Sequence, residues 1–213
     1  MKEKKVALVT GGSGGIGTEI CKSLAFAGYQ VIVNYNSNKE KALQTLNSLK
    51  ANKHNIFKAS ITENEDLEKM AMFVKENYGR LDVLVNNSGV TKPIPHIDLQ
   101  SLNNDLIDTI MQVNFRGSFA CIRAFESLLK KPENSIVVNI SSIAGRTGIG
   151  SNVAYCASKA AVDSMTRSLG RALAPKIRVV LEPVCFKILF MYLSIGTWKP
   201  NEQNEKIKSN FGN

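Results

Sequence analysis

The sequence is poor in the residues that build disulfide or metal centres. Its four cysteines, Cys21, Cys121, Cys156 and Cys185, lie far apart, and it has only two histidines. No Cys-x-x-Cys pair occurs, and no histidine stands at metal-ligand spacing from a cysteine. The pattern therefore predicts no disulfide framework and no metal site, and it favours reduced thiols in a cytoplasmic protein.

Long hydrophobic runs are also missing. The charged amino-terminal residues lead straight into Val6–Val9, which is shorter than the roughly 7–15 apolar residues of a secretory signal peptide. Residues 184–195 are strongly apolar, but they include Lys187 and fall short of the about 20 residues that span a bilayer. We therefore expect neither a signal peptide nor a membrane partner.

Acidic residues are outnumbered, since 27 lysines and arginines face 18 aspartates and glutamates, for a net charge of +9. The basic residues are scattered singly or in pairs, without the interleaved aromatic residues of a nucleic-acid stacking surface. A solvated basic surface is the simplest interpretation, and attraction to an acidic substrate or carrier is the alternative. We expect no nucleic-acid partner.

The sequence does contain a regular alternation of short apolar runs and longer segments with helical spacing. The apolar runs predict buried strands at residues 6–9, 31–33, 56–57, 81–85, 136–140 and 177–180. Between them, helices are predicted at 38–50, 99–130 and 153–173, and another begins with a capping box of Thr62 and Glu65. This order implies right-handed βαβ crossovers and a doubly wound, Rossmann-like parallel sheet in one α/β domain.

A glycine cluster follows the first predicted strand. Residues 10–17 read Thr-Gly-Gly-Ser-Gly-Gly-Ile-Gly. Two registers fit, G-x-G-x-x-G through Gly12, Gly14 and Gly17, and T-G-x-x-x-G-x-G from Thr10. Glycines between a strand and its helix let the backbone approach a pyrophosphate at the helix amino-terminus. The pattern therefore favours a dinucleotide site over a simple tight turn.

The end of the second strand bears on which nicotinamide cofactor binds. An aspartate or glutamate at this place holds the ribose 2′-hydroxyl of NAD. This sequence has Asn34 and Tyr35 there, and its next carboxylate is Glu40, flanked by Lys39 and Lys41. Neutral side chains and lysines suit a 2′-phosphate, so we predict NADP(H) rather than NAD. The absence of an arginine or lysine inside the glycine cluster is a feature against this prediction.

A second chemical motif opens the last predicted helix. Tyr155 and Lys159 are four residues apart, so they share one helical face. A phenol is a poor acid–base catalyst at neutral pH, but a neighbouring ammonium favours its ionised form. Ser142 stands just past the fifth predicted strand, where open parallel sheets bind ligands. The three residues predict a site for proton transfer.

Together these motifs resemble the short-chain dehydrogenase/reductase family over about residues 4–180. The resemblance rests on Thr10-Gly11-x-x-x-Gly15-Ile16-Gly17, Asn86-Asn87-Ser88-Gly89, Asn114, Ser142 and Tyr155-x-x-x-Lys159, in this order. Residues 10–35 look similar to 3-oxoacyl-carrier-protein and acetoacetyl-CoA reductases. The resemblance implies an oxidoreductase that transfers hydride from NADPH to a small-molecule or carrier-bound ketone, foremost a 3-oxoacyl thioester.

The same resemblance implies a catalytic tetrad. Tyr155 would protonate the carbonyl oxygen, and Ser142 would hydrogen-bond that oxygen. Lys159 would hold the nicotinamide ribose and favour proton exchange at Tyr155. Asn114 would position a water in the proton relay.

The resemblance also implies which residues contact the cofactor. They are Tyr155 and Lys159, with Gly11, Ser13, Gly15, Ile16, Gly17, Asn34, Tyr35, Ser60, Ile61, Asn87 and Gly89. At residues 60–61, family members often have Asp-Val. Dimers or tetramers of the same chain would form through the helices predicted at 99–130 and 153–173.

The carboxyl-terminal part departs from the family pattern. Members usually continue from the sixth strand into a Pro-Gly loop, a substrate helix and a seventh strand, and no Pro-Gly follows residue 180 here. We therefore expect a dinucleotide-binding and catalytic Rossmann domain, residues 1–180, and an atypical segment of the same domain, residues 181–213, without the last strand. The alternative function is an NADP-binding protein with little or no turnover, because the cover over the nicotinamide would be lost.

Overall fold

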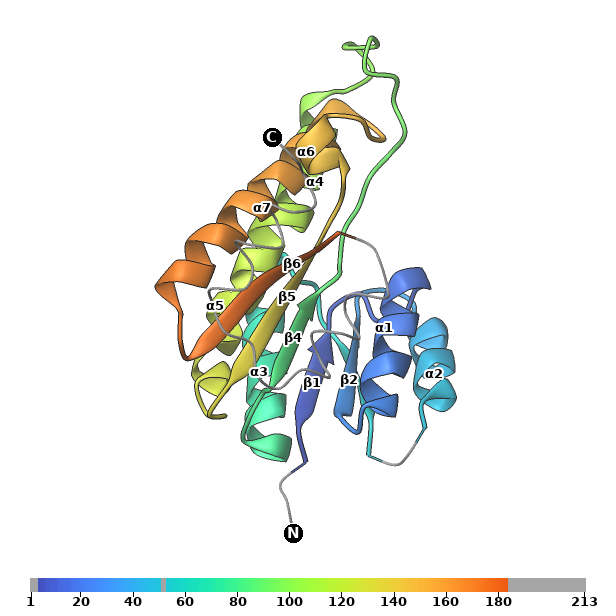
Figure 1. Cartoon of the computed structure of the whole chain (residues 1–213). Coiled ribbons are helices and arrows are strands. Elements are labelled where there is room, and N and C mark those ends of the chain that lie inside the picture. The colour runs from blue at the N-terminus through green and yellow to red at the C-terminus, as the bar shows by residue number, and fades with distance from the viewer. Residues whose placement is uncertain (1–3, 51–52, 184–213) are drawn as a thin grey trace.

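The computed structural model describes residues 4–50 and 53–183, which form one α/β unit around a parallel sheet (Figure 1). The sheet has six strands in the order β3-β2-β1-β4-β5-β6. Their bounds are β1 (Val6–Val9), β2 (Gln30–Tyr35), β3 (Asn55–Lys58), β4 (Val83–Asn86), β5 (Ser135–Ser141) and β6 (Ile177–Pro183). The chain builds outward from β1 to one edge and then from β4 to the other, which confirms the predicted doubly wound, Rossmann-like sheet.

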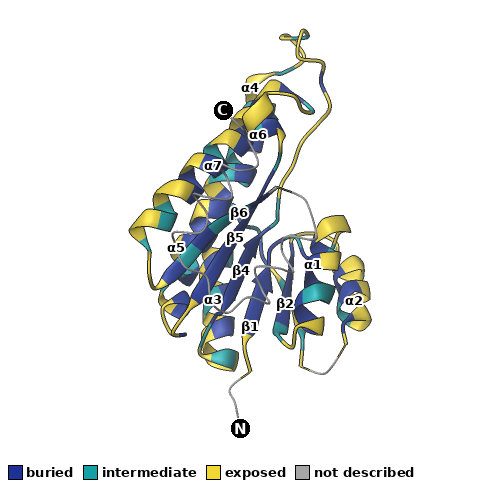
Figure 2. Ribbon diagram, viewed as in Figure 1, coloured by how far each residue is buried: buried dark blue, intermediate teal, exposed yellow. Residues whose placement is uncertain are grey.

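Helices cover both faces of the sheet. They are α1 (Gly15–Phe26), α2 (Lys39–Ser48), α3 (Asn64–Tyr78), α4 (Asn104–Met111), α5 (Ser118–Leu129), α6 (Ala144–Thr147) and α7 (Val153–Ala172). The central strands are buried throughout (Figure 2). Successive residues of β1 serve different cores, since Val6 and Leu8 pack toward α3, α5 and α7, whereas Ala7 and Val9 pack toward α1. A sheet enclosed on both faces explains why its strands read as continuous apolar runs.

Asparagine side chains cap the amino-terminal ends of three of the helices. Asn38 accepts a hydrogen bond from the Lys41 amide at 2.9 Å at the start of α2. Asn103 and Asn152 cap α4 and α7 in the same way. Each side chain accepts a hydrogen bond from an amide that has no partner inside the helix. Such a cap stabilises the helix by about 1 kcal/mol.

The helix predicted at 99–130 differs from the structure in two ways. It begins only at Asn104, and residues Gln112–Gly117 form a π-helical turn, η1, between α4 and α5. Close packing accompanies this turn, because a Cβ on Gly117 would lie 2.6 Å from the Cδ1 atom of Ile61. A π turn accommodates one extra residue in a helix and is frequent at functional sites.

The capping box predicted from Thr62 and Glu65 is wrong. Helix α3 begins at Asn64, and its N-cap residue Glu63 makes no side-chain capping bond. Instead, the Asp66 carboxylate accepts a hydrogen bond from the Ser60 amide at 2.8 Å. The first turn of α3 therefore holds the loop after β3, and its side chains do not cap the helix.

The carboxyl ends of all six strands meet at one end of the sheet. The order of the strands reverses there between β1 and β4, which pair in parallel through Ala7, Leu8 and Val9. In open α/β sheets the crevice at such a reversal is the usual ligand site. The loops after β1, β4 and β5 therefore frame the candidate site.

Strand β6 continues beyond the predicted residues 177–180. It pairs with β5 through Pro183, so residues 181–183 extend the sheet. The predictions about residues 184–213, including the missing strand and the lost cover, fall outside the described residues. Within the described part of the chain, no helix is both long and apolar enough to cross a membrane.

Candidate active site

The glycine loop brings helix α1 unusually close to the end of β1. Gly11 has φ +60°, in the left-handed region that favours glycine. A Cβ on Gly17 would lie only 2.3 Å from the Gly11 carbonyl oxygen. No side-chain rotation can relieve a clash between backbone atoms, so this contact requires glycine at position 17.

The opposite side of the loop is open. Gly14, Gly15 and Ile16 are exposed, Ser13 is half-buried, and a Cβ on Gly14 or Gly15 would meet nothing within 4 Å. The N-cap residue of α1, Gly14, offers no side-chain capping bond. The first amides of α1 thus face a space without side chains, which fits the pyrophosphate of a dinucleotide.

Asn87 joins the glycine loop to the end of β4. Its Nδ2 atom donates to the carbonyl oxygens of Thr10 and Gly11, each at 3.0 Å. The Thr10 hydroxyl in turn accepts from the amides of Asn87 and Ser88 at 3.0 and 3.1 Å. These bonds hold together the two loops at the reversal point of the sheet.

Asn34 lies inside the sheet and does not face the open side of the loop. It is 1% exposed, its Oδ1 atom accepts from the Gly11 amide at 3.3 Å, and its Nδ2 atom donates to the Ala59 oxygen at 3.0 Å. Tyr35 is also buried, at 6% exposure. Any influence of Asn34 on a nucleotide therefore passes through the backbone of Gly11.

Replacing Asn34 with aspartate is expected to destabilise the fold by about 3 kcal/mol. The carboxylate would be buried and could not donate to the oxygens of Phe57 and Ala59, which now accept from Nδ2 at 3.3 and 3.0 Å. Urea unfolding measures the change, with exposed Asn36→Asp as the matched control. Equal stability of the two variants would contradict the internal role of Asn34.

Ser60 and Ile61, predicted on the adenine side, follow β3. Ser60 is half-buried, and its hydroxyl lies 2.8 Å from that of Thr62. Ile61 is 6% exposed and packs against Gly117 of η1. The loop after β3 is therefore tied both to α3, through Asp66, and to the π turn.

Tyr155 and Lys159 share one face of α7, as their spacing predicts. The Lys159 ammonium lies 5.7 Å from the centroid of the Tyr155 ring and donates to the Ile140 oxygen at 2.8 Å. Gly89 lies next to it, because a Cβ there would be 3.8 Å from Lys159 Nζ and 3.3 Å from Asn114 Oδ1. The fold thus brings together residues of β5, α7, η1 and the loop after β4.

The environment of Lys159 shifts its proton affinity. Its side chain is buried, and this desolvation lowers the pKa of Lys159 from 10.5 to about 8, although the nearby Asp163 carboxylate opposes the shift. A lysine with a pKa near neutrality in a cleft is typical of a functional site.

Asn114 is enclosed in the π turn. It is 1% exposed, its Oδ1 atom accepts from the Val90 amide at 2.8 Å, and its Nδ2 atom donates to Ser158 Oγ at 3.0 Å. The Ser118 hydroxyl donates to the Asn114 backbone oxygen at 2.8 Å. The side chain therefore connects η1 with α7 and with the loop after β4.

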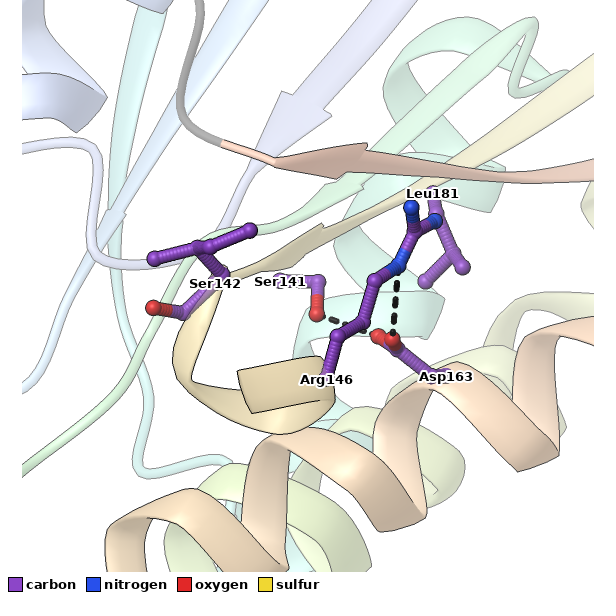
Figure 3. Close-up of a pocket in the computed structure, with 6 residues that line it drawn as sticks. Ser141, Ser142, Arg146, Asp163 and Leu181 are labelled. Carbon is purple, nitrogen blue, oxygen red and sulfur yellow. Dashed lines mark hydrogen bonds and ion pairs between the residues drawn. The ribbon is translucent and has the colours of Figure 1, made fainter. Parts of the chain in front are cut away.

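Ser142 is the first residue after β5. It is half-buried, and its Oγ atom accepts from the Ala144 amide at 3.2 Å. Ser141 points elsewhere, because its buried hydroxyl donates to Asp163, while Figure 3 shows the Ser142 side chain directed away from that carboxylate. A small cavity of about 60 Å³ lies beside these residues, lined also by Ile143, Arg146 and Leu181.

Two residues of this site escaped the sequence analysis. Asn152 is 1% exposed, accepts from the Tyr155 amide at 2.7 Å and donates to the Lys92 oxygen at 2.8 Å, so it places Tyr155 against the loop after β4. Its position just before the helix is a capping signal that could have been read. Asp163 is the other, and its spacing of four from Lys159 was the available signal.

Comparisons with known proteins agree on one family. A sequence model described as short chain dehydrogenase matches residues 5–186. The chain belongs to the short-chain dehydrogenase/reductase family. It is accordingly an oxidoreductase by family.

Relatives within this family include reductases and NADP complexes. The chain is 35% identical over 178 residues to the 3-oxoacyl-(acyl-carrier-protein) reductase FabG of Staphylococcus aureus strain Mu50, covering 83% of this chain and 71% of the relative. The Pseudomonas aeruginosa RhlG/NADP active-site complex superimposes with TM-score 0.76 at 32% identity, over 83% of this chain and 70% of that one. A Shigella flexneri 2a structure complexed with NADP gives TM-score 0.77 at 30% identity, over 83% and 75%.

Proposed function

We propose that this chain is an NADPH-dependent ketone reductase in which Tyr155 is the proton donor and the preferred substrate is a 3-oxoacyl thioester. The observation that carries the proposal is the position of Lys159 beside Tyr155, with Gly89 between the lysine and Asn114. Ser142 follows β5 at the same end of the sheet. These are the residue types that a hydride-accepting carbonyl needs around its oxygen.

The glycine loop would hold the cofactor. Gly11, Gly15 and Gly17 shape the loop, Ser13 and Ile16 line its open side, and Asn34 and Asn87 fix its backbone. When bound, NADPH supplies the hydride that adds to the carbonyl carbon. The proposed cofactor site also includes Gly89, Ser60, Ile61 and Tyr35.

The protein's own side chains would protonate the carbonyl oxygen of the substrate and stabilise its charge. The Tyr155 hydroxyl donates its proton to the carbonyl oxygen as negative charge develops there, and the Ser142 hydroxyl donates a hydrogen bond to the same oxygen. The Lys159 ammonium, 5.7 Å from the Tyr155 ring centroid, stabilises the negative charge left on the phenol oxygen. Asn114 fixes α7 against the loop after β4 through Ser158 and Val90, and its backbone would orient a water beside Lys159.

The preference for NADPH rests on charge near the end of β2. Lys39 and Lys41 are exposed at the start of α2, and no carboxylate follows β2 before Glu40. Lysines attract a 2′-phosphate, which an acidic side chain at the end of β2 would repel. The NADP complexes among the related structures support the same choice.

The rim of the site favours a substrate with an apolar part. Ile97, Leu99, Ile143 and Ile149 are 92%, 70%, 63% and 78% exposed on the two loops that border the site. The loops are joined, because the Ile94 amide donates to the Ser151 oxygen at 2.7 Å. Exposed apolar side chains on these loops suit an acyl chain, and the reductase FabG among the relatives supports a 3-oxoacyl thioester.

Steady-state kinetics test the proposal. The expected result is oxidation of NADPH that depends on a 3-oxoacyl thioester, with a higher kcat/KM than for a short ketone such as acetone, and slower turnover with NADH. A saturated acyl thioester, which lacks the ketone, is the matched control. Absence of ketone-dependent turnover would contradict the reductase, and tighter binding of NADH would contradict the cofactor choice.

The protein is also proposed to form a homo-oligomer in the cytoplasm. A groove of about 380 Å³ along η1, α5 and α7 is lined by Phe115, Phe119, Met165 and Leu169 among others, and Phe119 is 39% exposed. An apolar groove on a helical face supports contact with a second copy. Light scattering should give the mass of a dimer or tetramer. A reducing compartment fits the described cysteines, which are free and buried.

The pH dependence of the reaction is expected to follow Lys159. Its pKa of about 8 means that the ammonium is present below that pH and lost above it, so kcat/KM for reduction should fall above about pH 8. A pH–rate profile with a 3-oxoacyl substrate measures this decline. In Lys159→Arg, the guanidinium stays charged, and the decline should move out of the measurable range. A wild-type profile that is level to pH 10 would contradict the assignment.

A further inference from the structure

Two charged residues of α7 hold the last two residues of β5. Lys159 Nζ donates to the Ile140 oxygen at 2.8 Å, and the Asp163 carboxylate accepts from the Ser141 hydroxyl. Lys159 and Asp163 are one helical turn apart, and Ile140 and Ser141 are consecutive. The end of β5 is therefore fixed at two adjacent points immediately before Ser142.

Asp163 has a second partner on the far side of Ser142. Its Oδ2 atom lies 3.8 Å from Arg146 Nε, at the end of the short helix α6 (Figure 3). The Asp163 side chain is 6% exposed and that of Arg146 is 60% exposed, so the pair is weak as an ion pair. A buried carboxylate is costly in solvation, which makes stability alone a poor reason for it.

The two contacts enclose the segment that carries Ser142. Ser141 lies before it and Arg146 lies after it, so Asp163 limits the movement of residues 141–146 relative to α7. The same helix carries Tyr155 and Lys159. Asp163 therefore holds Ser142 in place relative to these two residues. A displacement of about 1 Å in such a constellation costs up to 10²-fold in rate.

The charge of Asp163 also acts on Lys159. Asp163 is the nearest carboxylate on α7, and it favours the protonated lysine against the effect of burial. Of the other groups near the site, Tyr155 is on the same helix, Arg146 is on α6, and Asn114 on η1 is uncharged. Glu182 on β6 pairs with Ile140 and points to the opposite face of the sheet from Leu181, which lines the cavity beside Asp163.

We propose that Asp163 is a positioning residue, which fixes the Ser142 segment through Ser141 and Arg146 against the helix that carries Tyr155 and Lys159. This inference rests on the proposed function, in which Ser142 and Lys159 act on the carbonyl oxygen and on Tyr155. Asp163 itself touches no reacting atom.

The test compares three variants of the full chain. Asp163→Asn removes the charge, and Ser141→Ala removes the hydroxyl while keeping the charge. Asp82→Asn is the matched control, because Asp82 is also a buried carboxylate with an arginine partner, Arg80, at 2.7 Å, but at the amino end of β4. For each, kcat and KM with a 3-oxoacyl thioester, the pH profile, and amide hydrogen exchange of residues 142–147 are measured.

For Asp163→Asn, kcat should fall by about 10- to 100-fold with a smaller change in KM, and the alkaline decline should move to lower pH. Residues 142–147 should exchange faster. Ser141→Ala should show the faster exchange and lower kcat without the shift in pH, and it keeps the inference testable should Asp163→Asn not fold. Asp82→Asn should change only stability.

The inference is overturned if Asp163→Asn matches Asp82→Asn in kcat, pH profile and exchange. If the wild-type chain reduces no ketone, the proposed function fails by itself. The hydrogen exchange and an NMR titration of the Lys159 side chain then still decide whether Asp163 holds the segment and the charge. Unchanged exchange and an unchanged Lys159 titration in Asp163→Asn would overturn the inference in that case too.

Discussion

Replacing Tyr155 with phenylalanine is expected to lower kcat for ketone reduction by roughly 10²–10⁴-fold, because the variant has no proton to donate to the carbonyl oxygen. The ring can keep its place, since the backbone bond from its amide to Asn152 does not involve the hydroxyl. The affinity for NADPH should change little. Stopped-flow measurement of NADPH oxidation gives the rate, and fluorescence titration gives the affinity.

Tyr29→Phe is a suitable control for this change. It removes a hydroxyl from a tyrosine that packs beside the core on the α1 side of the sheet. Its kcat should equal that of the wild type. Retained turnover in Tyr155→Phe would remove Tyr155 from the mechanism, and a loss of NADPH binding would show that the phenol serves binding instead.

Replacing Gly17 with alanine is expected to abolish NADPH binding and to lower the free energy of unfolding by about 3 kcal/mol or more. The added Cβ would lie 2.3 Å from the Gly11 oxygen and 2.7 Å from Asn87 Nδ2, so α1 must move away from β1. That movement displaces the helix amino-terminus that the pyrophosphate needs. Urea unfolding and fluorescence titration with NADPH measure the two effects.

Gly14→Ala is the matched control for the stability effect. A Cβ at position 14 meets nothing within 4 Å, and Gly14 has φ −140°, which any residue adopts. Its unfolding free energy should stay within about 0.5 kcal/mol of the wild type. A Gly17→Ala variant as stable as Gly14→Ala would show that the contact between Gly11 and Gly17 is not limiting.

The doubly wound parallel sheet was predictable from the sequence because its strands and helices depend on local pattern. Val6–Val9 is apolar at every position, as a strand buried on both faces requires, and the alternation of strands and helices restricts the connections to right-handed crossovers. The pair Tyr155 and Lys159 was predictable for the same reason, since helical periodicity alone places them together.

Other features depend on contacts between distant segments. The π turn forms where Gly117 meets Ile61, 56 residues earlier in the sequence, and no local pattern marks it. The bonds of the Asn34 side chain to Gly11 and Ala59 likewise join segments that are 23 and 25 residues away. The predicted capping box is absent because α3 begins at Asn64 with Glu63 as its N-cap residue, and Asp66 in its first turn accepts from the Ser60 amide.

The π turn also limits how this gene can change. Deleting one codon within Gln112–Gly117 would turn the bulge into regular α-helix, which is the easier backbone to form. Because the π turn holds one extra residue, the deletion would leave α4 and α5 nearly in phase, but it would move the residues inside the turn around the helix axis. A deletion before Asn114 would swing its amide away from Val90, and one after it would turn Gly117 away from Ile61. A change that makes the helix regular would therefore disturb the contacts of the π turn with Val90 and Ile61, so these contacts require the irregular turn.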